Sequence, residues 1–166
     1  EKDYEFRFRE VENGTRVGSG GVSGGASNIP NTVVAPVTFN TPKQQYDQAY
    51  GLVSSGDYAA AEISLLEFLE THPKDKLAGN AQYWLGQTYY ARGNYASAAR
   101  AFLEGMSKYP KSPKAPAYLL KVGMSLNLLG EKNEACEVFR ELNTQFPQST
   151  ENTRMRATEE RKAGCT

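Results

Sequence analysis

The stretch AQYWLGQTYYARGNYASAARAFLEGMSKYP, residues 81–110, decides the fold, because its pattern of small, aromatic and helix-breaking residues occurs three times in the chain. The copies lie 37 residues apart, as shown by Pro73, Pro110 and Pro147. Four further columns keep this interval, and they hold Gly56, Gly93 and Gly130; Ala61, Ala98 and Ala135; Ala49, Gly86 and Gly123; and Leu65, Phe102 and Phe139. Five columns with one period predict an array of helical repeats.

Each column has a physical role in a pair of antiparallel helices. Small residues such as Gly86 and Ala98 let two helices cross closely, because a large side chain at either point would hold the backbones apart. Gly93 suits the left-handed conformation that often ends a helix, and Pro110 disrupts a helix that runs into it. The sequence therefore predicts an all-α fold of three helical hairpins and a C-terminal capping helix.

The expected helices lie near residues 42–55, 58–71, 76–92, 95–108, 113–129 and 132–145, and short turns make each pair antiparallel. Thr41-Pro42 and Ser112-Pro113 each combine an N-cap hydroxyl with a proline at the first helical position. A seventh helix, near 149–163, would cap the open end of the stack. The domain at 42–166 would thus hold repeats at about 42–75, 76–112 and 113–149.

The residues before this domain differ from it in composition. Residues 1–12, EKDYEFRFREVE, place Tyr4, Phe8 and Val11 at the spacing of a coiled-coil seam, but a strand or a frayed polar end fits so short a piece as well. Residues 13–41 contain six glycines between positions 14 and 25, followed by Pro30 and Pro36. This composition predicts a flexible linker.

Composition excludes several classes of function. Lys plus Arg and Asp plus Glu both number 19, so the formal charge is zero and no basic field favours nucleic acid. No apolar stretch approaches the roughly 20 residues of a membrane-spanning helix. The single histidine, His72, precedes Pro73 in the column of Tyr109 and Phe146, where a flat ring ends a helix. We therefore expect no metal site, no cofactor and no catalytic residue.

The two cysteines, Cys136 and Cys165, predict a disulfide. If the capping helix runs antiparallel to the helix before it, its end returns to the start of that helix, where Cys136 lies. The sulfurs then meet if the Cα atoms approach to about 5.5 Å. Such a bridge would stabilise the fold by roughly 3–4 kcal/mol in the chain-entropy model and would suit an oxidising compartment. A buried thiol at 136 and a free thiol near the terminus is the alternative.

The repeat columns resemble those of the tetratricopeptide repeat, whose usual unit is about 34 residues. Two phrases, LAGNAQYWLGQTYY (77–90) and YPKSPKAPAYLLKVG (109–123), resemble the Tol-Pal system protein family YbgF/CpoB. That family combines an N-terminal coiled coil, a low-complexity linker and a C-terminal tetratricopeptide domain. The resemblance implies a tetratricopeptide repeat superhelix whose first helices line a groove for a partner.

The resemblance also implies a function. It implies a non-enzymatic periplasmic adaptor, peripheral to the membrane and made with a signal peptide, that binds TolA and works with a bifunctional penicillin-binding protein. Such an adaptor coordinates outer-membrane constriction with septal peptidoglycan synthesis during cell division. It forms a homotrimer through its coiled coil. The alternative is an envelope assembly factor resembling the lipoproteins that help insert outer-membrane β-barrels.

The groove positions of the family fall on an aromatic, weakly charged set of side chains in this chain. They are Lys43, Tyr46, Tyr50, Val53, Asn80, Tyr83, Gln87, Tyr90, Leu120, Met124 and Asn127. Tyrosine suits such a surface because its ring gives contact area and its hydroxyl can bond to a partner. The competing interpretation is that this row of rings belongs to the core between the repeats.

Overall fold

The computed structural model describes residues 41–165, and every regular element in that range is a helix. In chain order they are α2 (Pro42–Ser55), α3 (Tyr58–Thr71), α4 (Ala78–Ala91), α5 (Tyr95–Lys108), α6 (Ala115–Leu129), α7 (Lys132–Gln145), the π-helical turn η1 (Glu151–Arg156) and α8 (Ala157–Ala163). The predicted fold of three hairpins and a capping helix is confirmed. The predicted coiled-coil end at 1–12, and the predicted linker up to residue 40, lie outside the described residues.

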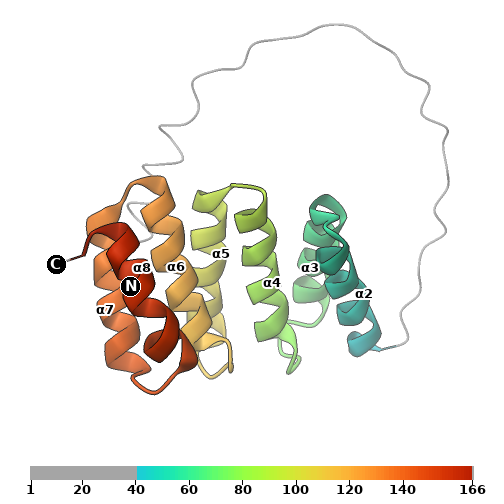
Figure 1. Ribbon diagram of the computed structural model, residues 1–166. Helices are drawn as coiled ribbons and strands as arrows, with labels where there is room; N and C mark the ends of the chain where they lie inside the picture. The colour runs from blue at the N-terminus through green and yellow to red at the C-terminus, as the bar shows by residue number, and fades with distance from the viewer. Residues whose placement is uncertain (1–40, 166) are drawn as a thin grey trace, which may run out of the picture. The chain divides into compact units, whose positions relative to one another are not determined.

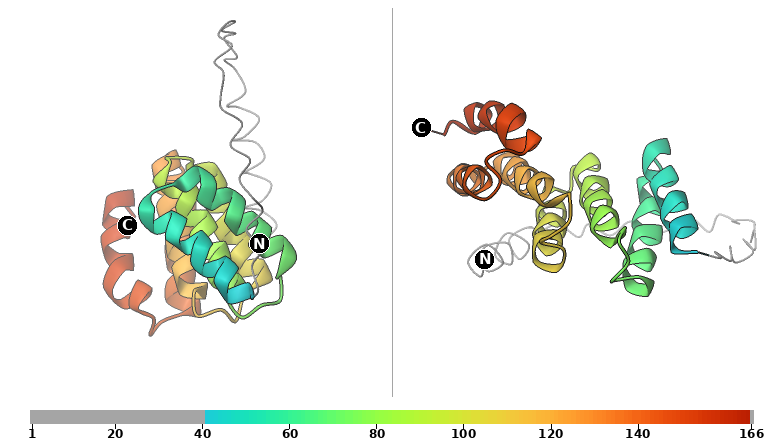
Figure 2. Two further views of the ribbon diagram at one scale, coloured as in Figure 1. Left: turned by 90° about the vertical axis from the view of Figure 1, so that its right-hand side faces the viewer. Right: turned by 90° about the horizontal axis from the view of Figure 1, so that it is seen from below.

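The hairpins α2–α3, α4–α5 and α6–α7 follow one another in a row, and the cap formed by η1 and α8 packs beside α6 and α7 (Figure 1). Figure 2 shows α2 and α3 at one end of this row and the cap at the other. The first helices of the first two hairpins also meet, since α2 contacts α4, and both parts of the cap contact α6. The cap therefore takes the place that the first helix of a fourth hairpin would occupy.

Glycines set the spacing between the two helices of the second hairpin and of the third. A Cβ atom built at Gly86 would overlap the ring of Phe102, and one at Gly123 would overlap the ring of Phe139. Both rings are fully buried, so the glycines let α4 and α6 lie directly against them. This is the role that the sequence predicts for the small-residue column.

Tyr118 joins the second hairpin to the third. Its ring is fully buried on α6 and fills the space beside Gly105 on α5. Its hydroxyl donates a hydrogen bond to the backbone carbonyl of Gly79 at the start of α4. Burial raises the pKa of this hydroxyl, which therefore stays protonated and keeps its hydrogen bond.

The helices end and begin at residues with identifiable chemistry. Thr41 caps α2 as predicted, because its Oγ1 accepts a hydrogen bond from the Gln44 amide at 3.2 Å. Gly56 and Gly130 follow α2 and α6 with φ of 80° and 89°, a left-handed conformation that glycine adopts without a steric penalty. His72 is the C-cap of α3, with its ring 5.3 Å from that of Phe68.

The connections between hairpins correct one expectation. Ser112 does not cap α6, which begins three residues later at Ala115 and has no side-chain cap. Its amide donates to the Tyr109 carbonyl, its carbonyl accepts from the Ala115 amide, and its hydroxyl accepts from the Lys114 amide. Asp75 makes the corresponding three bonds in the preceding connection. The hydroxyl of Ser112 therefore holds a turn, and Pro113 lies in that turn, so the helix starts later than predicted.

Candidate protein-interaction site

The surface formed by α2, α4 and α6, which we call the first-helix face, begins with an aromatic group shared by α2 and α4. Tyr46 and Tyr50 lie one turn apart on α2, with stacked rings 6.3 Å apart. The ring of Trp84 on α4 lies 4.9 Å from that of Tyr50, and its Nε1 donates a hydrogen bond to the Tyr46 hydroxyl at 3.1 Å. This hydrogen bond fixes the orientation of the indole while its ring remains partly exposed.

Two lysines continue this face toward α6. The Lys114 ammonium lies 4.8 Å from the ring centre of Tyr83 and 5.8 Å from that of Trp84. The Lys121 ammonium lies 4.7 Å from the ring centre of Tyr90. Such cation–π contacts hold each lysine ammonium against an aromatic ring.

The sequence analysis missed both lysines. Lys114 and Lys121 are seven residues apart, about two helical turns, and so are Tyr83 and Tyr90, so the spacing of the two lysines matches the spacing of the two tyrosines. That equal spacing was the available signal. It becomes informative only when α6 is known to lie beside α4.

The cap contributes negative charge to the same face. Burial lowers the pKa of Lys121, and the Glu159 carboxylate opposes this effect. Burial raises the pKa of Tyr83 and of Tyr90, and the carboxylates of Glu151 and Glu159 respectively add to this. The carboxylates of η1 and α8 are therefore close enough to act on the aromatic residues of α4.

One polar atom on this face has no hydrogen-bond partner. The Oε1 atom of Gln87 is buried, and no donor in the described part of the chain reaches it. Gln87 lies between Tyr83 and Tyr90 on α4. A buried acceptor without a donor is costly.

The predicted groove residues divide into three groups. Tyr50 is 41% exposed and is the most accessible ring of the set, while Lys43 is exposed and paired with Asp47. Tyr83 lies 5.7 Å from Phe102 and 6.2 Å from Tyr118, so it belongs partly to the core. The half-buried residues are Tyr46, Val53, Asn80, Gln87, Tyr90, Met124 and Asn127.

Leu120 is the exception, and its prediction as a groove residue is wrong. Its side chain is 1% exposed. The reason is that α6 lies between α5 on one side and the cap on the other, so this register position is covered. Its equivalent in the first hairpin, Tyr46, is half-buried because α2 has no helix before it in the described residues.

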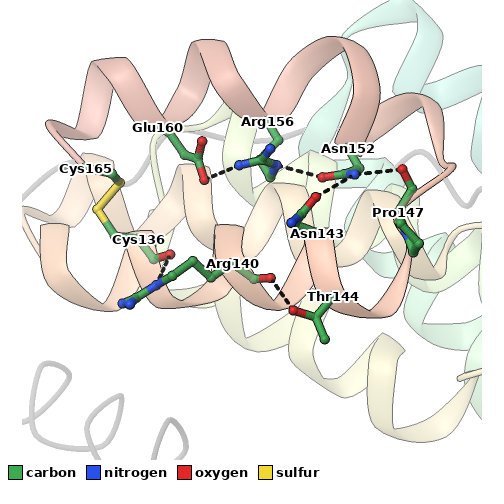
Figure 3. Close-up of polar contacts among 9 residues, drawn as sticks. All are labelled: Cys136, Arg140, Asn143, Thr144, Pro147, Asn152, Arg156, Glu160 and Cys165. Carbon is green, nitrogen blue, oxygen red and sulfur yellow. Dashed lines mark hydrogen bonds and ion pairs between the residues drawn. A yellow bond between two sulfur atoms is a disulfide. The ribbon is translucent and has the colours of Figure 1, made fainter.

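The two cysteines form a disulfide between Cys136 on α7 and Cys165 after α8, with Cα atoms 5.6 Å apart (Figure 3). The bond joins the end of the cap to the start of α7. Within residues 41–165 no group of acidic, histidine or cysteine side chains is arranged to bind a metal ion. No helix in that range is long and apolar enough to cross a membrane.

Comparisons with known proteins agree with this architecture. Models of the tetratricopeptide repeat match residues 46–113 and 117–149. Two curated relatives, both described as cell division coordinator CpoB and both from Pseudomonas putida, are 40% identical over 50 residues. That match covers 30% of this chain and 19% of the relatives, so it spans about a fifth of their length.

A solved structure shows the same fold. The second tetratricopeptide domain of human RPAP3, determined by NMR in complex with the HSP70 peptide SGPTIEEVD, superposes with a TM-score of 0.61. The match covers 76% of this chain and 100% of that domain, at 17% sequence identity. At this level of identity the likeness concerns the fold.

Proposed function

Because this chain belongs to the tetratricopeptide repeat proteins and resembles the cell division coordinator CpoB, we propose that it is a non-enzymatic adaptor in cell division. Its first-helix face binds a segment of a partner protein. The repeat family uses such faces for protein–protein interaction, and the RPAP3 domain of the same fold binds a peptide.

The observation that carries this proposal is the exposed aromatic group around Tyr50. This ring is 41% exposed and rests on Trp84, whose own orientation is fixed by its bond to Tyr46. A rigid, partly exposed aromatic group gives a partner a large contact area and loses little side-chain entropy on binding.

The proposed partner is TolA, and the proposed compartment is the periplasm. The disulfide between Cys136 and Cys165 supports this compartment, because such bonds persist where the environment is oxidising. In this setting the adaptor coordinates constriction of the outer membrane with septal peptidoglycan synthesis by a bifunctional penicillin-binding protein. Residues 1–12 would contribute to a homotrimer through a coiled coil.

The test is a calorimetric titration of the full chain with the isolated helical domain of TolA. Tyr50→Ala is expected to weaken binding about tenfold or more, because it removes the accessible ring of the face. Ile63→Ala is the matched control, since Ile63 is a large apolar side chain that is 69% exposed on α3, away from this face. Neither substitution should change the melting temperature by more than about 2 °C.

Two results would contradict the proposal. Equal binding by the wild type and Tyr50→Ala would show that the partner uses another surface. No binding to TolA, together with binding to a component of outer-membrane β-barrel assembly, would favour the envelope assembly factor instead.

A further inference from the structure

The cap is attached to the last hairpin at two separate points. Asn152 in η1 is buried, and its Nδ2 donates to the Asn143 side chain at 3.1 Å and to the Pro147 carbonyl at 2.8 Å. At the other end, Cys165 is bonded to Cys136. Figure 3 shows these two attachments at opposite ends of the cap.

Between the two attachments, α8 contributes little packing of its own. It has seven residues, and Ala163 is its one buried side chain. Its ion pairs join residues of the cap to one another, Arg156 to Glu160 and Lys162 to Glu159, and do not tie it to α7. A helix of this length is not stable alone, so its position depends on what holds its ends.

The junction between η1 and α8 divides the cap into two halves with different backbone geometry. The backbone changes from π-helical to α-helical between Arg156 and Ala157. π-helical turns are rare in proteins, and those that occur are often found at functional sites. Asn152 lies on the η1 side of this junction and the disulfide lies beyond α8, so the two attachments hold different halves of the cap.

The disulfide is accessible to other molecules. Both cysteines line an open surface cavity of about 540 Å³, together with Asn133, Glu137, Arg140, Glu160 and Gly164. Neither cysteine is fully buried. A thiolate must reach a sulfur atom to exchange with a disulfide, and the cavity provides that approach.

We propose that Cys136–Cys165 is a thiol–disulfide exchange site for a dithiol reductant, and that its reduction releases α8 while η1 stays attached through Asn152. A thiolate of the dithiol attacks one sulfur, and the other sulfur leaves as a thiolate. The second thiol of the reductant then resolves the mixed disulfide. The products are two protein thiols and one oxidised dithiol, so two electrons pass to the protein disulfide and two protons end on its cysteines.

Release of α8 changes the first-helix face. Glu159 lies on α8, and its carboxylate acts to raise the pKa of Lys121 and of Tyr90. When α8 leaves, this carboxylate leaves with it, and α6 loses part of its cover. The redox state of one bond thus controls both the charge and the extent of the face at its C-terminal end.

Hydrogen exchange followed by mass spectrometry tests this on the full chain, with dithiothreitol as the reductant. Reduction should raise the exchange rate of the amides of 157–165 by roughly tenfold or more, because the end of α8 loses its covalent bond to α7. The amides of η1 and of α2 to α6 should keep their rates. The double variant Cys136→Ser/Cys165→Ser should show the fast exchange of 157–165 without reductant and should not respond to it.

A second variant separates the two attachments. Asn152→Ala, with the disulfide intact, should speed exchange in 151–156 and leave 157–165 protected. Three outcomes would overturn the proposal: a disulfide that dithiothreitol does not reduce in the folded protein, unchanged protection of 157–165 after reduction, or loss of protection in all helices together. The first would show that the cavity gives no access, the second that packing holds α8, and the third that the bond stabilises the whole domain.

Discussion

Gly86 and Phe102 show how a pair of residues is matched in size across a hairpin. In the second and third hairpins a glycine on the first helix faces a phenylalanine on the second. The first hairpin has Ala49 and Leu65 in these two columns, and both are fully buried in one core cluster. A larger residue on one helix therefore accompanies a smaller one on the other, so that the space between the helices stays filled.

This match predicts the effect of Gly86→Ala. The added methyl group would overlap the Phe102 ring, so we expect the free energy of unfolding to fall by about 1–3 kcal/mol in urea denaturation. Gly51→Ala is the control, because Gly51 is an exposed position of α2 and a Cβ built there meets nothing within 4 Å. It should raise stability by about 0.5–1 kcal/mol.

The double variant Gly86→Ala/Phe102→Leu copies the first hairpin and completes the test. It should be more stable than Gly86→Ala alone, because leucine leaves room for the new methyl group. If the loss of stability in the double variant instead equals the sum of the two single losses, the side chains at positions 86 and 102 are not matched in size.

For single residues, sequence analysis identifies side chains whose role recurs in each hairpin, and it misses those whose burial or contacts depend on neighbouring helices. The column that holds Gly86 and Gly123 could be recognised from the sequence, because a larger side chain there would overlap a phenylalanine ring. Leu120 was misplaced because its register position is half-buried in α2, which has no helix before it in the described residues, but fully buried in α6, which lies between α5 and the cap. The Lys114 contact with Tyr83 was missed because it joins residues 31 positions apart, on helices whose adjacency the repeat pattern alone does not specify.

The second helices of the three hairpins begin alike in backbone but differ in their caps. Asp57, Asn94 and Glu131 have nearly the same conformation, with φ of −80°, −85° and −80° and ψ of 70°, 72° and 66°. Asp57 and Asn94 accept a hydrogen bond from the amide three residues on, at 3.3 and 3.2 Å. Glu131 makes no such bond. Its longer side chain is a poor N-cap, so α7 begins without the side-chain cap that the other two helices have.

We therefore expect Glu131→Asn to stabilise the protein by about 0.5–1 kcal/mol, measured by chemical denaturation. The opposite test is made on α5: Asn94→Ala should lower stability by about 1 kcal/mol, since it removes an existing cap. A destabilised Glu131→Asn variant would indicate that the glutamate has another role at the start of α7.

Helix boundaries were predictable where one residue decides them. Thr41 and the glycines after α2 and α6 were placed correctly, because a cap and a left-handed residue act locally. The start of α6 was placed two residues early, because Ser112 bonds within a turn in place of capping a helix. The π-helical turn in the cap had no signal in the sequence that we could interpret.

Over the whole molecule, burial rises from the first hairpin toward the middle of the stack. Helix α2 has two buried residues, Gln45 and Ala49, whereas α6 has nine. In a repeat stack each unit is stabilised mainly by its neighbours, so a terminal helix opens more easily than an internal one.

Native-state hydrogen exchange should reveal this gradient. The amides of α2 should exchange fastest among α2 to α7, and those of α6 slowest, under oxidising conditions. Equal protection along the stack would mean that the hairpins unfold as one cooperative unit. Calorimetric and van't Hoff enthalpies of unfolding that agree would support that contrary result.

The overall architecture followed from the sequence because repetition multiplies a weak signal. One proline or one glycine says little, whereas three of each at a constant interval define the helices, their ends and their pairing. The chemistry of the first-helix face did not follow in the same way. It depends on contacts between different repeats, where lysines, a tryptophan and the carboxylates of the cap meet, and these residues do not recur.

The two connections with identical hydrogen bonds, centred on Asp75 and Ser112, have a consequence for how such a protein can evolve. Because both joints are built alike, each hairpin is joined to its predecessor through a connection with the same pattern of backbone and side-chain hydrogen bonds. Duplication of a 37-residue segment within the gene would insert another module without disturbing those on either side. The length of the first-helix face would then grow in whole steps, with no need to redesign the interior.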